Sequence, residues 1–164
     1  MRNVQLNYEK MRLTVLKMGY DKAWILEEDM IAPKDALKKL LEVDAPVVSG
    51  YYMLRHGNPS SNIFLGMTGV SKAKDLARMY PNDETIETVG GAMGCLLLDR
   101  SVLENCSFIL KENCAPDTDF MAWCVRNKIK QMARLDVKCG HIRADGKVLY
   151  PDNTNENGWR LESA

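Results

Sequence analysis

The chain has 164 residues, which is the size of one domain with one hydrophobic core. Its 22 basic and 22 acidic residues balance to a formal net charge of +0, which excludes a general attraction to nucleic acid or to an anionic membrane. No apolar run reaches the roughly 20 residues of a transmembrane helix, and residues 1–10 lack the apolar core of a signal peptide. We therefore expect a cytoplasmic protein.

The cysteines do not form the pattern of a disulfide framework. Their number is odd, their spacing is irregular, and they include no Cys-x-x-Cys pair: Cys95, Cys106, Cys114, Cys124 and Cys139. Cys139 and His141 could supply two ligands to a soft metal ion, but a closed zinc site needs about four. Zinc therefore remains an alternative that lacks ligands.

The first half of the chain alternates between helical and strand-like segments. Apolar residues at steps of three and four predict a helix over Asn3–Met18, which Gly19 ends. The next predicted elements are a buried strand at Ala23–Leu26, a helix from Pro33 to Leu41, and a strand at Pro46–Tyr51. This alternation predicts an α/β fold with a mostly parallel sheet flanked by helices.

The second half is less regular, and its loop Arg55–Ser61 and the following residues are hard to interpret. We predict a short strand at Asn62–Gly66, a helix at Ser71–Tyr80, strands at Cys95–Leu98 and Gln131–Val137, and a helix from Asp117 to about Lys128. The residues after Tyr150 are polar and are expected to be loose. We therefore predict one domain over residues 1–150 and a polar tail over residues 151–164.

Three consecutive acidic residues, Glu27, Glu28 and Asp29, follow the strand Ala23–Leu26 directly. In open α/β sheets, ligands bind at the carboxyl ends of the strands. A cation would relieve the repulsion between these carboxylates. Mg²⁺ and Mn²⁺ prefer oxygen ligands and often share their shell with phosphate. The segment therefore predicts a metal–diphosphate site, and the alternative is a solvated turn whose acids favour the next helix.

Two further positions carry groups that could take part in chemistry. Asp117 and Asp119 lie at the start of a predicted helix, where capping alone would explain them, but where a carboxylate could also act as a general base. His141 follows the last predicted strand of the domain. A lone loop histidine is usually surface, unless that strand ends beside the acidic segment, where the imidazole could complete a metal shell.

In this order the segments resemble the GT-A glycosyltransferases, specifically the family 2-like enzymes. The matching stretches cover about 140 residues: Arg2-Asn3, WILEEDMIAPKDALKKLL (Trp24–Leu41), PVVSGYY (Pro46–Tyr52), GGAMGCLLLDRSVLE (Gly90–Glu104), PDTDFMAWCVRNK (Pro116–Lys128) and VKCGHI (Val137–Ile142). The resemblance implies a GT-A-like fold that is truncated at its N-terminus, because the family's usual nucleotide-binding βαβ segment would precede residue 1.

The resemblance also implies roles for individual residues. Glu27 and Asp29 correspond to the two acids of the D-x-D motif, and His141 to a histidine that joins the shell of Mn²⁺ or Mg²⁺. Asp117 corresponds to the base that deprotonates the acceptor hydroxyl in an inverting displacement. The implied donor- and acceptor-binding residues are Arg2, Asn3, Glu28, Gly94 and Asp119. The implied partners are a nucleotide-sugar donor and a hydroxyl acceptor.

Departures from the family pattern leave alternatives open. The first acid of D-x-D is Glu27 rather than aspartate, and Pro116 replaces the glutamate that precedes the base. The chain could therefore be a non-catalytic remnant that binds a nucleotide sugar or a protein partner. A phosphate-handling α/β enzyme of another family is a third reading, which would place His141 far from Asp29. We also expect a truncated sheet to expose an apolar edge, and therefore self-association or a partner that completes the N-terminal half.

Overall fold

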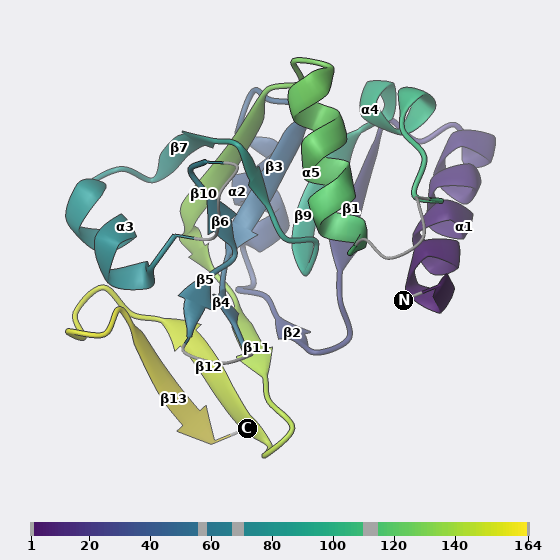
Figure 1. Ribbon diagram of the computed structural model, residues 1–164. Helices are drawn as coiled ribbons and strands as arrows, with labels where there is room; N and C mark the ends of the chain where they lie inside the picture. Colours follow the sequence, from purple (N-terminus) through teal and green to yellow (C-terminus); the bar gives the residue numbers. More distant parts are fainter. Residues whose placement is uncertain (1, 56–58, 67–70, 110–114, 164) are drawn as a thin grey trace.

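The computed structural model describes residues 2–55, 59–66, 71–109 and 115–163. A central sheet carries helices on both of its faces, and a smaller sheet lies beside it (Figure 1). The helices of the described residues are α1 (Arg2–Met18), α2 (Ala36–Leu41), α3 (Ala73–Met79), α4 (Arg100–Asn105) and α5 (Pro116–Arg126). Of these helices, none is long and apolar enough to cross a lipid bilayer.

The central sheet has five strands in the order β1-β9-β3-β10-β7. Their bounds are β1 Lys22–Leu26, β3 Val47–Tyr51, β7 Thr85–Thr88, β9 Cys95–Asp99 and β10 Gln131–Lys138. In the described part of this sheet β3 and β10 alone pair in parallel. Strand β9 lies antiparallel between β1 and β3, and β7 is antiparallel to β10. The prediction of a mostly parallel sheet is therefore wrong, although β1, β3, β9 and β10 form close to where the sequence predicted strands.

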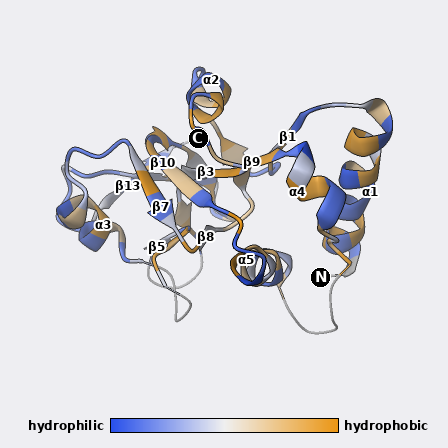
Figure 2. Cartoon of the chain, turned by 90° about the horizontal axis from the view of Figure 1, so that it is seen from above, coloured by the Kyte–Doolittle hydropathy of each residue, from blue (hydrophilic) through white to orange (hydrophobic). Residues whose placement is uncertain are grey.

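The two faces of the central strands pack against different helices, which explains both their composition and the wrong prediction. On β9, Leu96 and Leu98 join the core cluster that includes residues of α4 and α5, whereas Cys95 and Leu97 join the cluster that includes α2. Figure 2 shows α2 and α5 on opposite sides of the sheet. A strand that is buried on both faces is apolar throughout, so its sequence does not reveal the direction of its neighbour.

A second, antiparallel sheet has the order β13-β12-β11-β2. Its strands are β2 Met30–Ile31, β11 Gly140–Ile142, β12 Lys147–Pro151 and β13 Trp159–Ser163. Two short antiparallel pairs complete the described strands: β4 Met53–Leu54 with β5 Ser60–Ser61, and β6 Ile63–Phe64 with β8 Gly90–Gly91.

The sequence suggested a loose C-terminal tail, but the structure places Trp159–Ser163 in a strand. Strand β13 pairs with β12 from Trp159 opposite Pro151 to Ser163 opposite Lys147. Most of β13 is exposed to solvent, because it is the edge strand of its sheet. An exposed edge strand needs few apolar residues, so polarity alone does not distinguish it from a loop.

The acidic turn after β1 connects the two larger sheets. The Glu27 N–H donates to the Gly94 carbonyl beside β9 at 3.0 Å, and the Ile142 N–H of β11 donates to the Asp29 carbonyl at 2.8 Å. His141 is the register partner of Met30 across β11 and β2. Backbone bonds therefore fix this turn on both sides, and they bring the histidine strand beside the acidic residues.

Candidate functional site

A pocket of about 270 Å³ lies where the two larger sheets meet. It is lined from α1, the turn after β1, the β3–β4 segment, the β8–β9 segment, the start of α5 and β11. The lining residues are Val4, Tyr8, Glu27, Asp29, Tyr52, Leu54, Arg55, Ala92, Met93, Ala115, Pro116, Asp117 and His141. The structure thus brings Glu27, Asp29, Asp117 and His141 into one lining. A phosphate-handling enzyme of another family would have placed His141 far from Asp29, whereas the two residues line the same pocket.

Asp29 is the most constrained carboxylate of the pocket. Its Oδ2 lies 3.4 Å from His141 Nε2 and 2.5 Å from Arg55 Nη1. Its Oδ1 is buried and accepts no hydrogen bond from the described residues. A buried carboxylate oxygen without a partner is costly, which is why such atoms are rare away from ligand and metal sites.

His141 is held in one orientation by the backbone of β4. Its Nδ1 lies 2.8 Å from the Met53 carbonyl oxygen, which can only accept, so Nδ1 carries a proton. In the neutral ring Nε2 therefore presents a lone pair to Asp29 Oδ2. The Tyr52 ring contacts the imidazole edge-on at 5.6 Å between centroids. Two acceptor atoms that face each other can both act as ligands to a cation between them.

Tyr8 and Glu27 form the side of the pocket next to α1. The Tyr8 hydroxyl donates to Glu27 Oε1, and the Tyr8 ring packs against Phe108 at 5.7 Å between centroids. Burial raises the pKa of Tyr8 above its usual range, and the hydrogen bond to Glu27 and the charges of Glu27, Asp117 and Asp29 raise this pKa further. Tyr8 therefore remains a protonated donor.

Tyr52 closes the floor of the pocket and is fixed by two buried groups. Its hydroxyl accepts from the Gly94 N–H at 2.9 Å, and its backbone N–H donates to Asn62 Oδ1 at 3.0 Å. Burial raises the pKa of Tyr52 well above its usual range, and the hydrogen bond from Gly94 only partly offsets this. The floor is therefore rigid and uncharged.

Asp117 lies in the first turn of α5, which Pro116 opens as the first helical residue. Its Oδ1 accepts from the Thr118 N–H at 2.8 Å. Its Oδ2 accepts no hydrogen bond from the described residues, and the side chain is half-buried. The carboxylate is therefore oriented through one oxygen, while the other is free to contact a ligand in the pocket.

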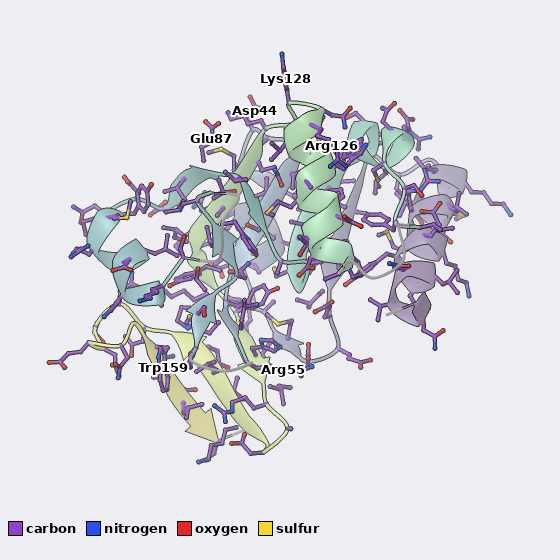
Figure 3. The ribbon with its side chains drawn as sticks, in the orientation of Figure 1. Asp44, Arg55, Glu87, Arg126, Lys128 and Trp159 are labelled. Carbon is purple, nitrogen blue, oxygen red and sulfur yellow. The ribbon has the colours of Figure 1, made fainter. Side chains whose placement is uncertain are left out.

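Arg55 and Tyr8 are lining residues that the sequence did not single out. Arg55 lies at the junction of the two sheets, near β2 and β11 (Figure 3), and pairs with Asp29. Tyr8 belongs to the apolar stripe of α1, so its pattern indicated only burial. The surplus of acids at the strand end implied a cationic partner, but nothing in the sequence selected one of the 22 basic residues.

The remaining predicted site residues lie outside this lining. Glu28 is exposed and borders a neighbouring hollow of about 560 Å³, which shares Tyr8, Glu27, Asp29 and Arg55 with the pocket. Asn3 is exposed on α1, Asp119 is half-buried on α5, and the side chain of Arg2 lies outside the described part of the chain. Asn3 and Asp119 are therefore not among the lining residues, and Glu28 meets Glu27 and Asp29 only in the neighbouring hollow.

Gly94 has a packing role that the sequence did not suggest. It is buried, and a Cβ atom there would lie 2.8 Å from the Tyr52 hydroxyl oxygen and 3.2 Å from the Met30 sulfur. Its carbonyl also accepts the Glu27 N–H. The absent side chain makes room for Tyr52 rather than for a ligand.

The donor set of Asp29 and His141 fits a divalent cation. Two ligands at about 2.1 Å from one cation and at right angles to each other lie about 3.0 Å apart, close to the 3.4 Å between Oδ2 and Nε2. The unpartnered Oδ1 and the Nδ1–H bond to Met53 are typical of such ligands. The described residues contain no group of three or more His, Cys, Asp or Glu side chains that could hold a metal ion. Oxygens of phosphate and water would complete the shell.

The zinc alternative gains no support. Cys139 is fully buried in the core cluster that contains Cys95, and the four described cysteines are free thiols. Burial makes a thiol harder to ionise: for example, it raises the pKa of Cys124 to about 12. Cys139 lies between β10 and β11 and packs in the core, whereas His141 lies in β11 and lines the pocket.

Comparisons with known proteins give a fold and no family. No family model matches the chain, and no curated protein matches it. The crystal structure of A197 from STIV is similar, with a TM-score of 0.69 and 18% sequence identity over 98% of this chain and 76% of that chain. At this identity the similarity establishes the fold alone.

These findings correct the family that the sequence motifs suggested. The chain has a mixed α/β fold with several mostly antiparallel sheets, resembling A197, and not the mostly parallel sheet of the GT-A expectation. The prediction of a truncated GT-A domain is therefore wrong. Short motifs with acids after an apolar strand and a glycine before a histidine arise in many α/β folds, so their order did not determine this one.

Proposed function

We propose that this protein is a metal-dependent transferase that moves a sugar from a nucleoside-diphosphate sugar to an acceptor hydroxyl, with inversion. One observation carries the proposal: a single pocket contains both Asp29 and His141, whose facing atoms could hold a cation, and a separate carboxylate, Asp117, with one oxygen that accepts no hydrogen bond from the described residues. The pocket and the adjoining hollow have volumes of about 270 and 560 Å³, the size range of sites for small organic ligands.

The charges of the pocket support an anionic ligand that arrives with a metal ion. Among the described lining residues, the carboxylates Glu27, Asp29 and Asp117 outnumber the one arginine, Arg55. A diphosphate alone would be repelled, whereas a divalent cation on Asp29 and His141 would offset the carboxylates. When bound, Mn²⁺ or Mg²⁺ would stabilise negative charge on the departing diphosphate.

The chain's own residues would supply the proton transfer. Asp117 Oδ2 would accept the proton of the acceptor hydroxyl while that oxygen forms a bond to the anomeric carbon. The bond from this carbon to the diphosphate oxygen would break, and the diphosphate would leave with the electron pair. Tyr8 and Tyr52, both held in their protonated form, would hold the floor and wall of the pocket without adding charge.

A second function is favoured by a specific contact: binding of a nucleotide sugar without catalysis. Arg55 already neutralises Asp29, the carboxylate that would otherwise hold the metal ion. The pocket could therefore recognise a diphosphate through Arg55, without a metal ion. Binding that does not depend on a metal ion would distinguish this function from the first.

The compartment and assembly of the protein are also proposals. We propose the cytoplasm, because Cys95, Cys106, Cys124 and Cys139 are free thiols, as is usual in reducing surroundings. We also propose self-association through β1, which is the last strand of its sheet and ends at Leu26, 40% exposed. A monomer at high concentration in analytical ultracentrifugation would contradict the second proposal.

The experiment that tests the function is calorimetric titration with UDP and GDP, with and without Mn²⁺. We expect binding that requires Mn²⁺, that is lost in Asp29→Ala and that is retained in Asp117→Asn. Asp145→Ala is the matched control, because Asp145 is an exposed acid of the β11–β12 turn outside the lining. Sugar transfer or donor hydrolysis should then be lost in Asp117→Asn. Binding that ignores both Mn²⁺ and Asp29 would contradict the proposal.

A further inference from the structure

Arg55 occupies the side of Asp29 where the proposed cation would bind. Its Nη1 lies 2.5 Å from Asp29 Oδ2, the same oxygen that faces His141 Nε2 at 3.4 Å. The same Nη1 also donates to the Ile142 carbonyl at 3.3 Å. A guanidinium and a divalent cation cannot both approach this oxygen closely, because their charges repel at such distances.

Arg55 can leave Asp29 at low cost. Its side chain is 38% exposed, so the guanidinium can be solvated outside the pocket. An ion pair with a partly exposed arginine contributes little net stability, since water and salt compete for both charges. The residue also lines both the pocket and the adjoining hollow, so a guanidinium released from Asp29 remains beside the space for a ligand.

We infer that Arg55 is an exchangeable counter-cation: it neutralises Asp29 before a metal ion binds, and afterwards turns to bind a phosphate group of the ligand. A planar guanidinium binds two phosphate oxygens at once, which an ammonium group cannot do. This inference rests on the proposed function for the class of ligand. It adds that Arg55 couples the binding of the cation to the binding of the anion.

The exchange predicts two effects of opposite sign. Removing Arg55 frees Asp29, so the metal ion alone should bind more tightly. Removing it also deletes a phosphate contact, so the anion should bind more weakly once the metal ion is present. An arginine that only orders Asp29 would instead weaken metal binding when it is removed.

The test measures both affinities by calorimetry, using Mn²⁺ alone and inorganic pyrophosphate at saturating Mn²⁺. Compared with the wild type, Arg55→Met should bind Mn²⁺ about tenfold more tightly and pyrophosphate about tenfold more weakly, within the usual range of coupling between sites. Arg143→Met is the matched control, because Arg143 pairs with Asp145 at 3.4 Å outside the lining. Both affinities of the control should stay within about twofold of the wild type.

The results separate failure of the exchange from failure of the proposed function. Mn²⁺ binding that depends on Asp29 but is unchanged or weaker in Arg55→Met overturns the exchange alone. Absence of Mn²⁺ binding in the wild type and in Arg55→Met overturns both. Binding that appears only in Arg55→Met supports the exchange, because it shows that Arg55 blocks the cation. Thermal melting checks folding, and Arg55→Gln replaces the methionine variant if the latter does not fold.

Discussion

Two clusters of charged side chains in the described part of the chain differ in their partners. In the first, which we call the Arg134 network, Arg134 contacts Asp136, Glu84 and Glu42 at 2.6, 3.2 and 3.7 Å, and Lys39 contacts Asp136 and Asp35 at 3.1 and 3.0 Å. Every carboxylate of the network therefore has a cationic partner. In the pocket Asp29 pairs with Arg55, whereas Glu27 and Asp117 form no ion pair with any described residue.

This difference indicates that the two clusters serve different purposes. The Arg134 network connects β10 to α2 and to the residues before β7, and its charges are balanced locally or reach solvent. The pocket concentrates carboxylates around a buried, unpartnered oxygen of Asp29, an arrangement that stabilises no fold by itself. We infer that the Arg134 network stabilises the folded protein, and that the carboxylates of the pocket lower its stability but serve ligand binding.

The largest expected effect is on metal binding by Asp29→Asn. The substitution keeps the size of the side chain but removes the charge and one ligand oxygen, so Mn²⁺ affinity should fall by at least about 100-fold. Asp136→Asn is the matched change in the Arg134 network and should bind Mn²⁺ as the wild type does. Calorimetry of the two variants separates the clusters. Equal Mn²⁺ affinity in both would remove the distinction.

A smaller loss of metal affinity is expected for His141→Gln. The glutamine amide can replace the donor to the Met53 carbonyl but is a weaker metal ligand than imidazole, so Mn²⁺ affinity should fall about tenfold. Paramagnetic resonance of free Mn²⁺ gives the bound fraction directly. An unchanged bound fraction would show that His141 only supports Asp29.

The network variant Asp136→Asn should be less stable by about 1 kcal/mol at pH 7. Burial opposes the ionisation of Asp136, but bonds from Arg134 and Lys39 outweigh it and hold the pKa of Asp136 below its usual value. Because the folded-state pKa is lowered, the charge stabilises the fold above about pH 4, and this contribution is lost as the pH falls through the folded-state pKa. Urea unfolding between pH 3 and pH 7 should show the difference shrinking at acid pH. A difference that is constant with pH would contradict the ionic origin.

The smallest expected effect is a gain in stability from Glu27→Gln, of about 0.5 kcal/mol or ~1–2 °C in Tm. The amide oxygen can still accept from Tyr8, while one negative charge near Asp29 and Asp117 disappears. Thermal melting at low salt measures the change. A clear loss of stability would mean that the Glu27 carboxylate is itself a structural group, as in the Arg134 network.

Local sequence patterns were sufficient to predict most helices and most strands of the central sheet, but not their arrangement or the strands of the smaller sheets. The apolar runs of β1, β3, β9 and β10 and the periodic stripes of α1 and α5 specify elements through nearby residues. Strand order and direction depend on contacts between distant residues, and β9 is equally apolar on both faces. The C-terminal hairpin was missed because its edge strand, Trp159–Ser163, is mostly polar.

The candidate site could be predicted in part, for a comparable reason. The position of Glu27 and Asp29 after a strand, and of His141 at the start of the next sheet, placed them at strand ends, and backbone pairing between β2 and β11 brings those ends together. Arg55 and Tyr8 meet the acids through tertiary contacts that leave no periodic signal in one sequence. The family inferred from the same motifs was wrong, so the role of these residues remains a prediction.

The central claim, that the pocket binds a divalent cation between Asp29 and His141, can be tested most directly by crystallography with Mn²⁺. Anomalous difference maps from crystals grown with Mn²⁺ and UDP should show a peak bonded to Asp29 and His141, with the Arg55 guanidinium turned from Asp29 to the diphosphate. A pocket without such a peak, in which Arg55 still pairs with Asp29, would contradict the account.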